Sequence, residues 1–161
     1  ARAREAGRAV TIFPWERAVQ AWIARVSTPL LRPLHVVNVA LADEGLVTAS
    51  IPLIAIGWFI AGNRWRGIVV MIALLASPRI EEWLKGLAMR GRPRDPHEWG
   101  LPSGDCALVT IWTAPLVGWW AAVPIGIVAW ARVARDAHFP LDVIAGIGLG
   151  LWLVSPALLG R

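Results

Sequence analysis

The sequence predicts an all-α fold: a transmembrane bundle of about five helices with an N-terminal amphipathic segment, in one domain over residues 1–161. Hydrophobic residues make up 57% of the chain and charged residues 17%, and the mean hydropathy of +0.56 exceeds that of ordinary soluble domains. Apolar runs of roughly membrane-spanning length recur from residue 46 onward. Many of the eleven tryptophans stand near the ends of these runs, where indole rings meet lipid headgroups.

Residues 1–45 are predicted to lie along the membrane surface, because arginines and apolar residues mix there as in a basic amphipathic helix. The segment has no long apolar core and no small-residue cleavage site, so we expect no signal peptide. Thr28-Pro29 and Arg32-Pro33 end the first helix, and 34–43 forms a short second one. The basic residues of the first helix are Arg2, Arg4, Arg8, Arg17 and Arg25, and its apolar residues are Val10, Ile12, Trp15, Val19, Trp22 and Ile23.

The first two spans are predicted at 46–61 and 67–89. The first is nearly uncharged and just long enough to cross at about 1.5 Å per residue. The second opens with apolar residues and carries Arg79, Glu81, Glu82 and Lys85 in its last part. Charges inside a span usually face a bundle interior or a wet cavity. Glu81 and Lys85 are spaced to pair on one helix face.

The remaining spans are predicted at 104–120, 123–135 and 141–159. A loop rich in Arg, Pro and Gly precedes the third span, and Ser103 has the position of its N-cap. Pro140 suits the first helical position of the fifth span, where its missing N–H costs nothing. Small residues in that span favour close helix packing, namely Ala145, Gly146, Gly148 and Gly150.

Three polar clusters fall at the ends of these spans, at 85–93, 102–105 and 132–142. The end of the second span, the start of the third, the end of the fourth and the start of the fifth share one membrane face in an up-down bundle. The topology therefore predicts that the clusters meet. Their chemistry-bearing residues are Lys85, Arg92, Pro93, Ser103, Gly104, Asp105, Arg132, His138 and Asp142.

These residue types suit phosphate chemistry. A reacting phosphate ester needs cations and N–H donors aimed at its growing charge, and arginine matches phosphate oxygens two at a time. A glycine at a helix N-terminus lets backbone N–H groups approach an anion. Lys85, Arg92 and Arg132 are the candidate cations, with Ser103 and Gly104 at the helix N-terminus. Each cluster alone also has a structural explanation, because helix-end arginines meet headgroups and Pro-Ser-Gly forms a capping turn.

His138 and Asp142 flank the start of the fifth span. A carboxylate on one ring nitrogen fixes the tautomer and frees the other nitrogen as a nucleophile or base. The alternative is a histidine that caps a helix and pairs with the aspartate for structure alone. His97 is a further acid or base candidate in the loop, although a solvated histidine there needs no such role.

Other classes of site find little support in the sequence. No pair of Cys or His has metal-ligand spacing, so we expect neither a metal nor a cofactor. The net charge of +5 suits anionic lipid headgroups, and no basic stripe with exposed aromatics indicates nucleic acid. Cys106, the single cysteine, is expected to be a small buried residue. The bilayer is the expected partner, and no protein partner can be inferred.

The motifs resemble those of the type 2 phosphatidic acid phosphatase superfamily of membrane lipid phosphatases, whose signatures run Lys-x6-Arg-Pro, Pro-Ser-Gly-His and Ser-Arg-x5-His-x3-Asp. The resemblance covers about residues 46–155. It implies that His138 attacks phosphorus to form a phosphohistidine, that Asp142 orients it, and that water hydrolyses the intermediate without a metal. It also implies that the phosphate is bound by Lys85, Arg92, Arg132, Ser103 and Gly104. Ala131 stands where the third signature has Ser.

Asp105 departs from the second signature, which has a histidine assigned to protonating the leaving group. Three interpretations stay open. Asp105 is the native general acid, a role that requires it to be protonated; it is an engineered replacement that traps substrate; or the protein binds lipid phosphates without hydrolysing them.

The resemblance implies an integral membrane phosphatase acting on a lipid phosphate or diphosphate of the polyprenyl diphosphate, phosphatidate or phosphatidylglycerophosphate type. The alternatives are a lipid phosphotransferase with a non-water acceptor and a non-catalytic lipid-phosphate binder or transporter. Arg64 and Arg66 place the loop after the first span inside, which puts the active face on the extracytoplasmic side of a bacterial inner membrane. The arginine-rich N-terminus would then also lie outside unless 34–43 helps it cross. Vanadium haloperoxidases share the motifs, but continuous apolar spans argue against a soluble oxidase.

Overall fold

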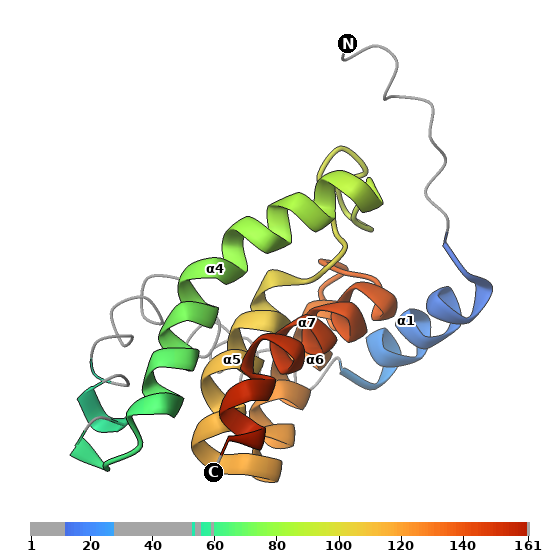
Figure 1. Ribbon diagram of the computed structural model, residues 1–161. Coiled ribbons are helices and arrows are strands. Elements are labelled where there is room, and N and C mark those ends of the chain that lie inside the picture. Colours follow the sequence, from blue (N-terminus) through green and yellow to red (C-terminus); the bar gives the residue numbers. More distant parts are fainter. Residues whose placement is uncertain (1–11, 28–52, 54–55, 59, 161) are drawn as a thin grey trace.

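The computed structural model describes residues 12–27, 53, 56–58 and 60–160, and this part of the chain is all-helical, as predicted (Figure 1). It contains no strand, only an isolated antiparallel bridge between Gly91 and Trp99. The predicted helix 34–43 and most of the predicted span 46–61 lie outside the described residues. The helices are α1 (Pro14–Ser27), α4 (Arg64–Ala88), α5 (Gly104–Val117), the 3-10 helix η2 (Gly118–Ala121), α6 (Ala122–Ala134) and α7 (Pro140–Leu159).

The predicted helix starts agree with the structure to within a few residues. Asn63 caps α4 by accepting a hydrogen bond from the Arg66 N–H at 3.4 Å, so α4 begins before residue 67. Ser103 holds the N-cap position of α5, although its hydroxyl makes no capping hydrogen bond. Pro140 is the first residue of α7, and the Asp142 carboxylate caps that helix by accepting from the Phe139 N–H at 2.9 Å.

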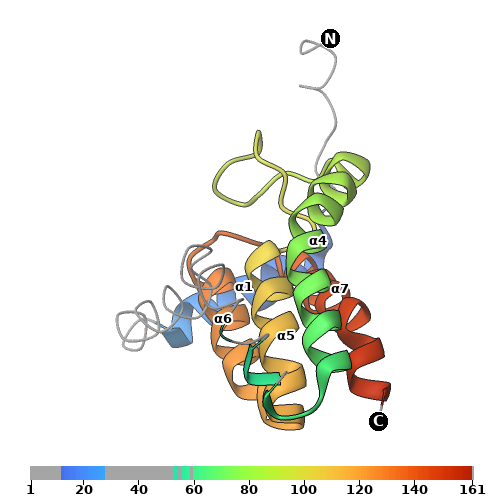
Figure 2. The same cartoon turned by 60° about the vertical axis from the view of Figure 1, so that its left-hand side comes forward.

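The turn between α5 and α6 comes earlier than predicted. Gly118 has φ +60°, a left-handed conformation that glycine adopts without strain, and it ends α5 at Val117. The short helix η2 then reverses the chain, and α6 returns alongside α5 (Figure 2). The 14 residues of α5 and 13 of α6 reach only about 20 Å each. Both are therefore shorter than the roughly 30 Å hydrocarbon core of a bilayer.

By length and composition, two helical stretches of the described residues are sufficient to cross a membrane. They are Gly104–Ala134, with a mean hydropathy of 1.6, and Pro140–Leu159, with 1.8. The first includes α5, η2 and α6, so its 31 residues form a hairpin rather than one rod. The 25-residue helix α4 exposes a row of large apolar side chains but is charged near its end.

The core of the bundle is built around α5. Its residues Cys106, Val109 and Ile111 are fully buried and pack against α4, α6 and α7, so the expectation for Cys106 is confirmed. Helix α7 approaches α5 through Gly146 and Gly150: a Cβ on Gly146 would overlap the Ser103 carbonyl, and one on Gly150 would lie 2.7 Å from the Ala107 carbonyl. The predicted close packing of small residues is thus confirmed for Gly146 and Gly150 and is wrong for Gly148, which is exposed with nothing within 4 Å of an added Cβ. The contacts of Gly146 and Gly150 hold the starts of α5 and α7 together.

Helix α1 packs against α6 and α7 at the end of the bundle where α7 begins (Figure 1). Its described part follows the predicted amphipathic pattern at Ile23, which is buried, and at Arg17 and Arg25, which are exposed, but the apolar Trp15 and Trp22 are exposed too. The predicted helix residues Arg2, Arg4, Arg8 and Val10 lie outside the described residues. The Trp22 ring meets Trp130 of α6 edge-on, with centroids 5.6 Å apart. Two polar residues of α1 are also fully buried, Glu16 and Ser27. The Ser27 hydroxyl donates to the Ile23 carbonyl within the helix, whereas the amphipathic pattern does not predict the buried Glu16.

Candidate active site

Four helix ends meet at one end of the bundle, as the topology predicts. Arg132 at the end of α6 pairs with Asp105 at the start of α5, with 2.7 Å between the guanidinium nitrogen and the carboxylate oxygen. The Ser103 N–H, before α5, donates to the Asp142 carbonyl in α7 at 2.9 Å. The end of α4 joins through Glu81, whose carboxylate lies against Gly104. The three sequence clusters therefore form one site.

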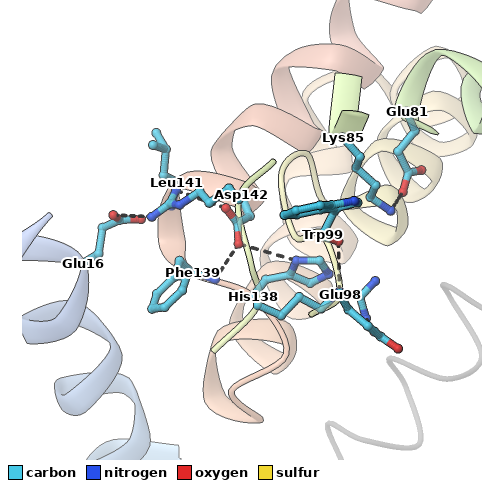
Figure 3. A network of polar contacts seen from close by, with 11 residues as sticks. Glu16, Glu81, Lys85, Glu98, Trp99, His138, Phe139, Leu141 and Asp142 are labelled. Atoms are coloured by element: carbon cyan, nitrogen blue, oxygen red, sulfur yellow. Dashed lines mark hydrogen bonds and ion pairs between the residues drawn. The ribbon is translucent and has the colours of Figure 1, made fainter. Parts of the chain in front are cut away.

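His138 is buried, with 2% of its surface exposed. Its position follows from the turn after α6: the N–H groups of Ala137 and His138 both donate to the Arg132 carbonyl, at 3.0 and 3.3 Å. The spacing between Arg132 and His138 in the sequence thus corresponds to a closed turn. The imidazole Nδ1 lies 3.7 Å from Asp142 Oδ2, too far for a hydrogen bond, and has no other partner among the described residues (Figure 3).

Asp142 is fully buried and held from three sides. Its Oδ2 accepts from the Phe139 N–H at 2.9 Å, and its Oδ1 accepts from Arg90 at 3.1 Å. The loop after α4 closes the third side at Gly100, where a Cβ would come within 2.9 Å of Oδ2. The carboxylate is thereby fixed beside the imidazole.

Each of the three predicted phosphate-binding cations already holds a carboxylate. Lys85 pairs with Glu81, as predicted from their spacing. Arg92 pairs with Glu98 at 2.8 Å, within the same loop, and Arg132 pairs with Asp105. The cations line the site, but a phosphate would have to displace or share these carboxylates.

The N-terminus of α5 also has an anion beside it. A Cβ on Gly104 would overlap both oxygens of Glu81, so glycine is required for this carboxylate to lie there. The Ser103 hydroxyl is fully buried and finds no hydrogen-bond partner among the described residues. The N-terminus of α5, where the sequence predicts a bound phosphate, therefore lies against the carboxylate of Glu81 in this structure.

Two further residues of the site were not predicted from the sequence, Arg90 and Glu16. The guanidinium of Arg90 bridges Asp142 and Glu16, with 2.5 Å to Glu16 Oε2. Arg90 lies between Lys85 and Arg92 in the sequence, so the sequence alone shows that it is close to the first cluster. Glu16 lies 74 positions from Arg90, and no local pattern indicates that contact.

Electrostatics favour an ionised Glu16. Burial by itself raises the pKa of this carboxyl group, but the hydrogen bonds from Arg90 and from the Phe13 N–H, together with the charge of Arg90, outweigh burial and lower the pKa below 4.5.

The side chain of His97, the further acid or base candidate, is exposed in the loop between α4 and α5. No group of three His, Cys, Asp or Glu residues that could hold a metal ion occurs in the described part of the chain.

The geometry joins a buried imidazole, a carboxylate behind it and four cations from α4, the loop after α4 and α6, each of them paired with a carboxylate. Such an arrangement can hold an anionic group while a ring nitrogen attacks it. Comparison with protein-family models, with curated proteins and with solved structures found no match to this chain.

Proposed function

We propose that this protein is an integral membrane phosphatase that hydrolyses a lipid phosphate or diphosphate through a phosphohistidine on His138. The convergence of four helix ends around a buried His138 carries the proposal. That site contains Lys85, Arg92 and Arg132, the cations shared with the type 2 phosphatidic acid phosphatase signatures.

Membrane insertion in a five-span bundle is part of the proposal. Two apolar helical stretches support it, as do large apolar side chains exposed on helices that a soluble protein would cover. These include Ile68, Ile72 and Leu75 on α4 and Leu151 and Trp152 on α7. Such faces suit lipid tails, while the polar helix ends would sit at headgroup depth, in a bacterial inner membrane with the active face extracytoplasmic.

In the proposed reaction, the ring nitrogen of His138 that faces away from Asp142 attacks phosphorus. The new N–P bond forms as the P–O bond to the lipid breaks, and the leaving oxygen keeps the bonding electrons and takes up a proton. Water then attacks phosphorus, the N–P bond breaks, and inorganic phosphate leaves with His138 restored. The guanidinium and ammonium groups stabilise the charge on the transferring oxygens.

The ion pair between Asp105 and Arg132 favours a second candidate function. In this pair the Asp105 carboxylate accepts from Arg132 and does not serve as a proton donor to a leaving oxygen. A site in this state would bind a lipid phosphate without cleaving it. A phosphotransferase would use the same phosphohistidine with an alcohol in place of water.

The test is phosphate release by the purified protein in detergent micelles containing phosphatidate, phosphatidylglycerophosphate or a polyprenyl diphosphate. We expect release by the wild type and loss to background in His138→Ala, since the nucleophile is gone. Acid-labile, alkali-stable labelling by a ³²P-labelled substrate should disappear in the same variant.

His97→Ala is the matched control, because it removes an exposed loop histidine and should leave turnover unchanged. Turnover retained in His138→Ala would overturn the nucleophile assignment. Binding of the lipid phosphates without release by the wild type would favour the binder, and label appearing in an added alcohol would favour the transferase.

A further inference from the structure

Arg90 connects the first helix of the described chain to the centre of the site. Only 6% of Arg90 is exposed, and a buried guanidinium needs partners to offset its lost hydration. It has two, Asp142 Oδ1 at 3.1 Å and Glu16 Oε2 at 2.5 Å. Its guanidinium carbon also lies 5.1 Å from the centroid of the Phe139 ring, next to His138. Arg90 is therefore held against the start of α7.

Glu16 is a fully buried acid in the first turn of α1. Besides Arg90, it accepts from the Phe13 N–H at 2.9 Å and from the Leu141 N–H at 3.2 Å. The second of these bonds reaches across to the first turn of α7, one residue before Asp142. Glu16 thus binds both the guanidinium that holds Asp142 and the backbone that carries it.

The charges in this group do not cancel. Two buried carboxylates share one guanidinium, which leaves one surplus negative charge beside the His138 ring, whose Nδ1 is 3.7 Å from Asp142 Oδ2. An imidazole that attacks phosphorus through one nitrogen and keeps its proton on the other becomes cationic. A fixed negative charge on the far side of the ring stabilises that cation.

We propose that Glu16 and Arg90 are positioning residues for His138, so that helix α1 is part of the active site. Arg90 holds the Asp142 carboxylate at the ring. Glu16 accepts from the second terminal nitrogen of the same guanidinium. The positive charge of Arg90 is therefore shared between two carboxylates and does not cancel the negative charge of Asp142. This inference rests on the proposed phosphohistidine reaction.

Glu16→Gln tests it, because the amide keeps an oxygen for the Leu141 N–H and loses only the charge. We expect kcat for phosphate release to fall about 10- to 100-fold, the range seen when the hydrogen-bond partner that orients a metal-bound histidine is removed, with KM little changed. Arg90→Lys should behave similarly, since a point charge cannot bridge two carboxylates as a planar fork does. Glu82→Gln, an exposed acid on α4, is the matched control and should retain full activity.

A second readout does not depend on turnover. Diethyl pyrocarbonate acylates neutral imidazoles, and exposed His97 serves as an internal reference for His138 in mass spectra taken at mildly alkaline pH. We expect Glu16→Gln to slow acylation of His138 about tenfold relative to His97, because the cationic intermediate loses its counter-charge.

The outcomes separate the two proposals. Unchanged kcat in Glu16→Gln, or faster acylation of His138 through loosened packing, would overturn the positioning role. If the wild type releases no phosphate yet Glu16→Gln still slows acylation, the phosphatase proposal fails while the positioning of His138 stands.

Discussion

The ion pair between Asp105 and Arg132 determines what each of these residues can do. The two side chains form an ion pair, with 2.7 Å between the guanidinium nitrogen and the carboxylate oxygen. Turnover through Asp105 would require it to gain a proton as the phosphate takes over Arg132. In the proposed reaction, Asp105 therefore has one of two roles. It is a proton donor that regains its proton in each catalytic cycle, or it competes with the phosphate for Arg132 throughout.

Two substitutions at this position separate those roles. Asp105→His should preserve or raise phosphate release, because an imidazolium can protonate the leaving oxygen and no longer pairs with Arg132. Asp105→Asn also frees Arg132 but supplies no proton, so its rate should fall by about 100-fold or more if the carboxyl group is the acid. Equal rates for Asn and Asp would rule out that role, and an inactive Asp105→His would contradict the comparison with the family signature.

At this scale, the sequence predicts residues whose neighbours are local. The pair Glu81 and Lys85 follows from helix geometry, and Asp142 next to His138 from one helical turn. Glu16 and Arg90 could not be predicted, since their contact depends on how α1 packs against α7. The carboxylate of Glu81 beside Gly104 likewise depends on the packing of α4 against α5.

Between helices, the close approach of α7 to α5 fixes the site. The Ser103 carbonyl occupies the space that a side chain at Gly146 would need, so Asp142 and Ser103 are adjacent only because residue 146 is glycine. The four-residue spacing of Gly146 and Gly150 places both on one face of α7, where backbones can come close.

Gly146→Ala and Gly150→Ala should each lower stability by about 1–3 kcal/mol, the usual cost of overpacking a core. Gly148→Ala is the control, because no atom lies within 4 Å of its added Cβ and alanine is the better helix former by roughly 1 kcal/mol. Thermal unfolding in detergent measures all three. A Gly148→Ala protein as unstable as Gly146→Ala would show that contact with α5 is not the cause.

The docking of α1 should depend on pH through Glu16. Because the pKa of Glu16 is lowered on folding, its contribution is complete above the ordinary value of 4.5 and is lost as pH falls through the lower folded-state pKa. The unfolding temperature of the wild type should therefore drop more steeply in acid than that of Glu16→Gln. Parallel curves for the two proteins would show that this carboxylate does not couple α1 docking to pH.

Helix boundaries show where sequence reasoning was sufficient. Pro140 and Ser103 mark starts by rules of local chemistry, and both predictions were right. The end of α5 was predicted three residues late, because 118–120 continue the apolar run and only the backbone of Gly118 shows that the chain turns there. Hydropathy reports how apolar a segment is, and a straight helix and the tip of a hairpin can be equally apolar.

At the scale of the whole molecule, the all-α prediction is confirmed for the residues that the structure describes, and the five-span arrangement stays a prediction. Composition was sufficient to predict the all-α class, because long uncharged apolar runs are typical of helices that lie in lipid. Composition was insufficient for the five-span arrangement, since α5 and α6 are each too short to cross a bilayer of ordinary thickness without local thinning of that bilayer.

Sidedness can be measured with one introduced cysteine. In a Cys106→Ala background, His97→Cys places a single thiol in the exposed loop beside the site. If the active face is extracytoplasmic, a membrane-impermeant maleimide should label this thiol in intact bacterial cells expressing the protein. Labelling only after the membrane is opened would place the face in the cytoplasm and contradict the orientation inferred from Arg64 and Arg66.

Lys85, Arg92 and Arg132 are each paired with a carboxylate of the protein, and these pairs affect which lipids can bind. Bilayers are crowded with phosphodiester headgroups that carry a single negative charge, and such a headgroup gains little by exchanging places with Glu81, Glu98 or Asp105, which carry the same charge. A terminal phosphate or diphosphate brings a second charge and more oxygens, so it can outcompete the protein's own acids. In the proposed reaction, these three carboxylates would keep the phosphodiester lipids of the surrounding bilayer from occupying the cations.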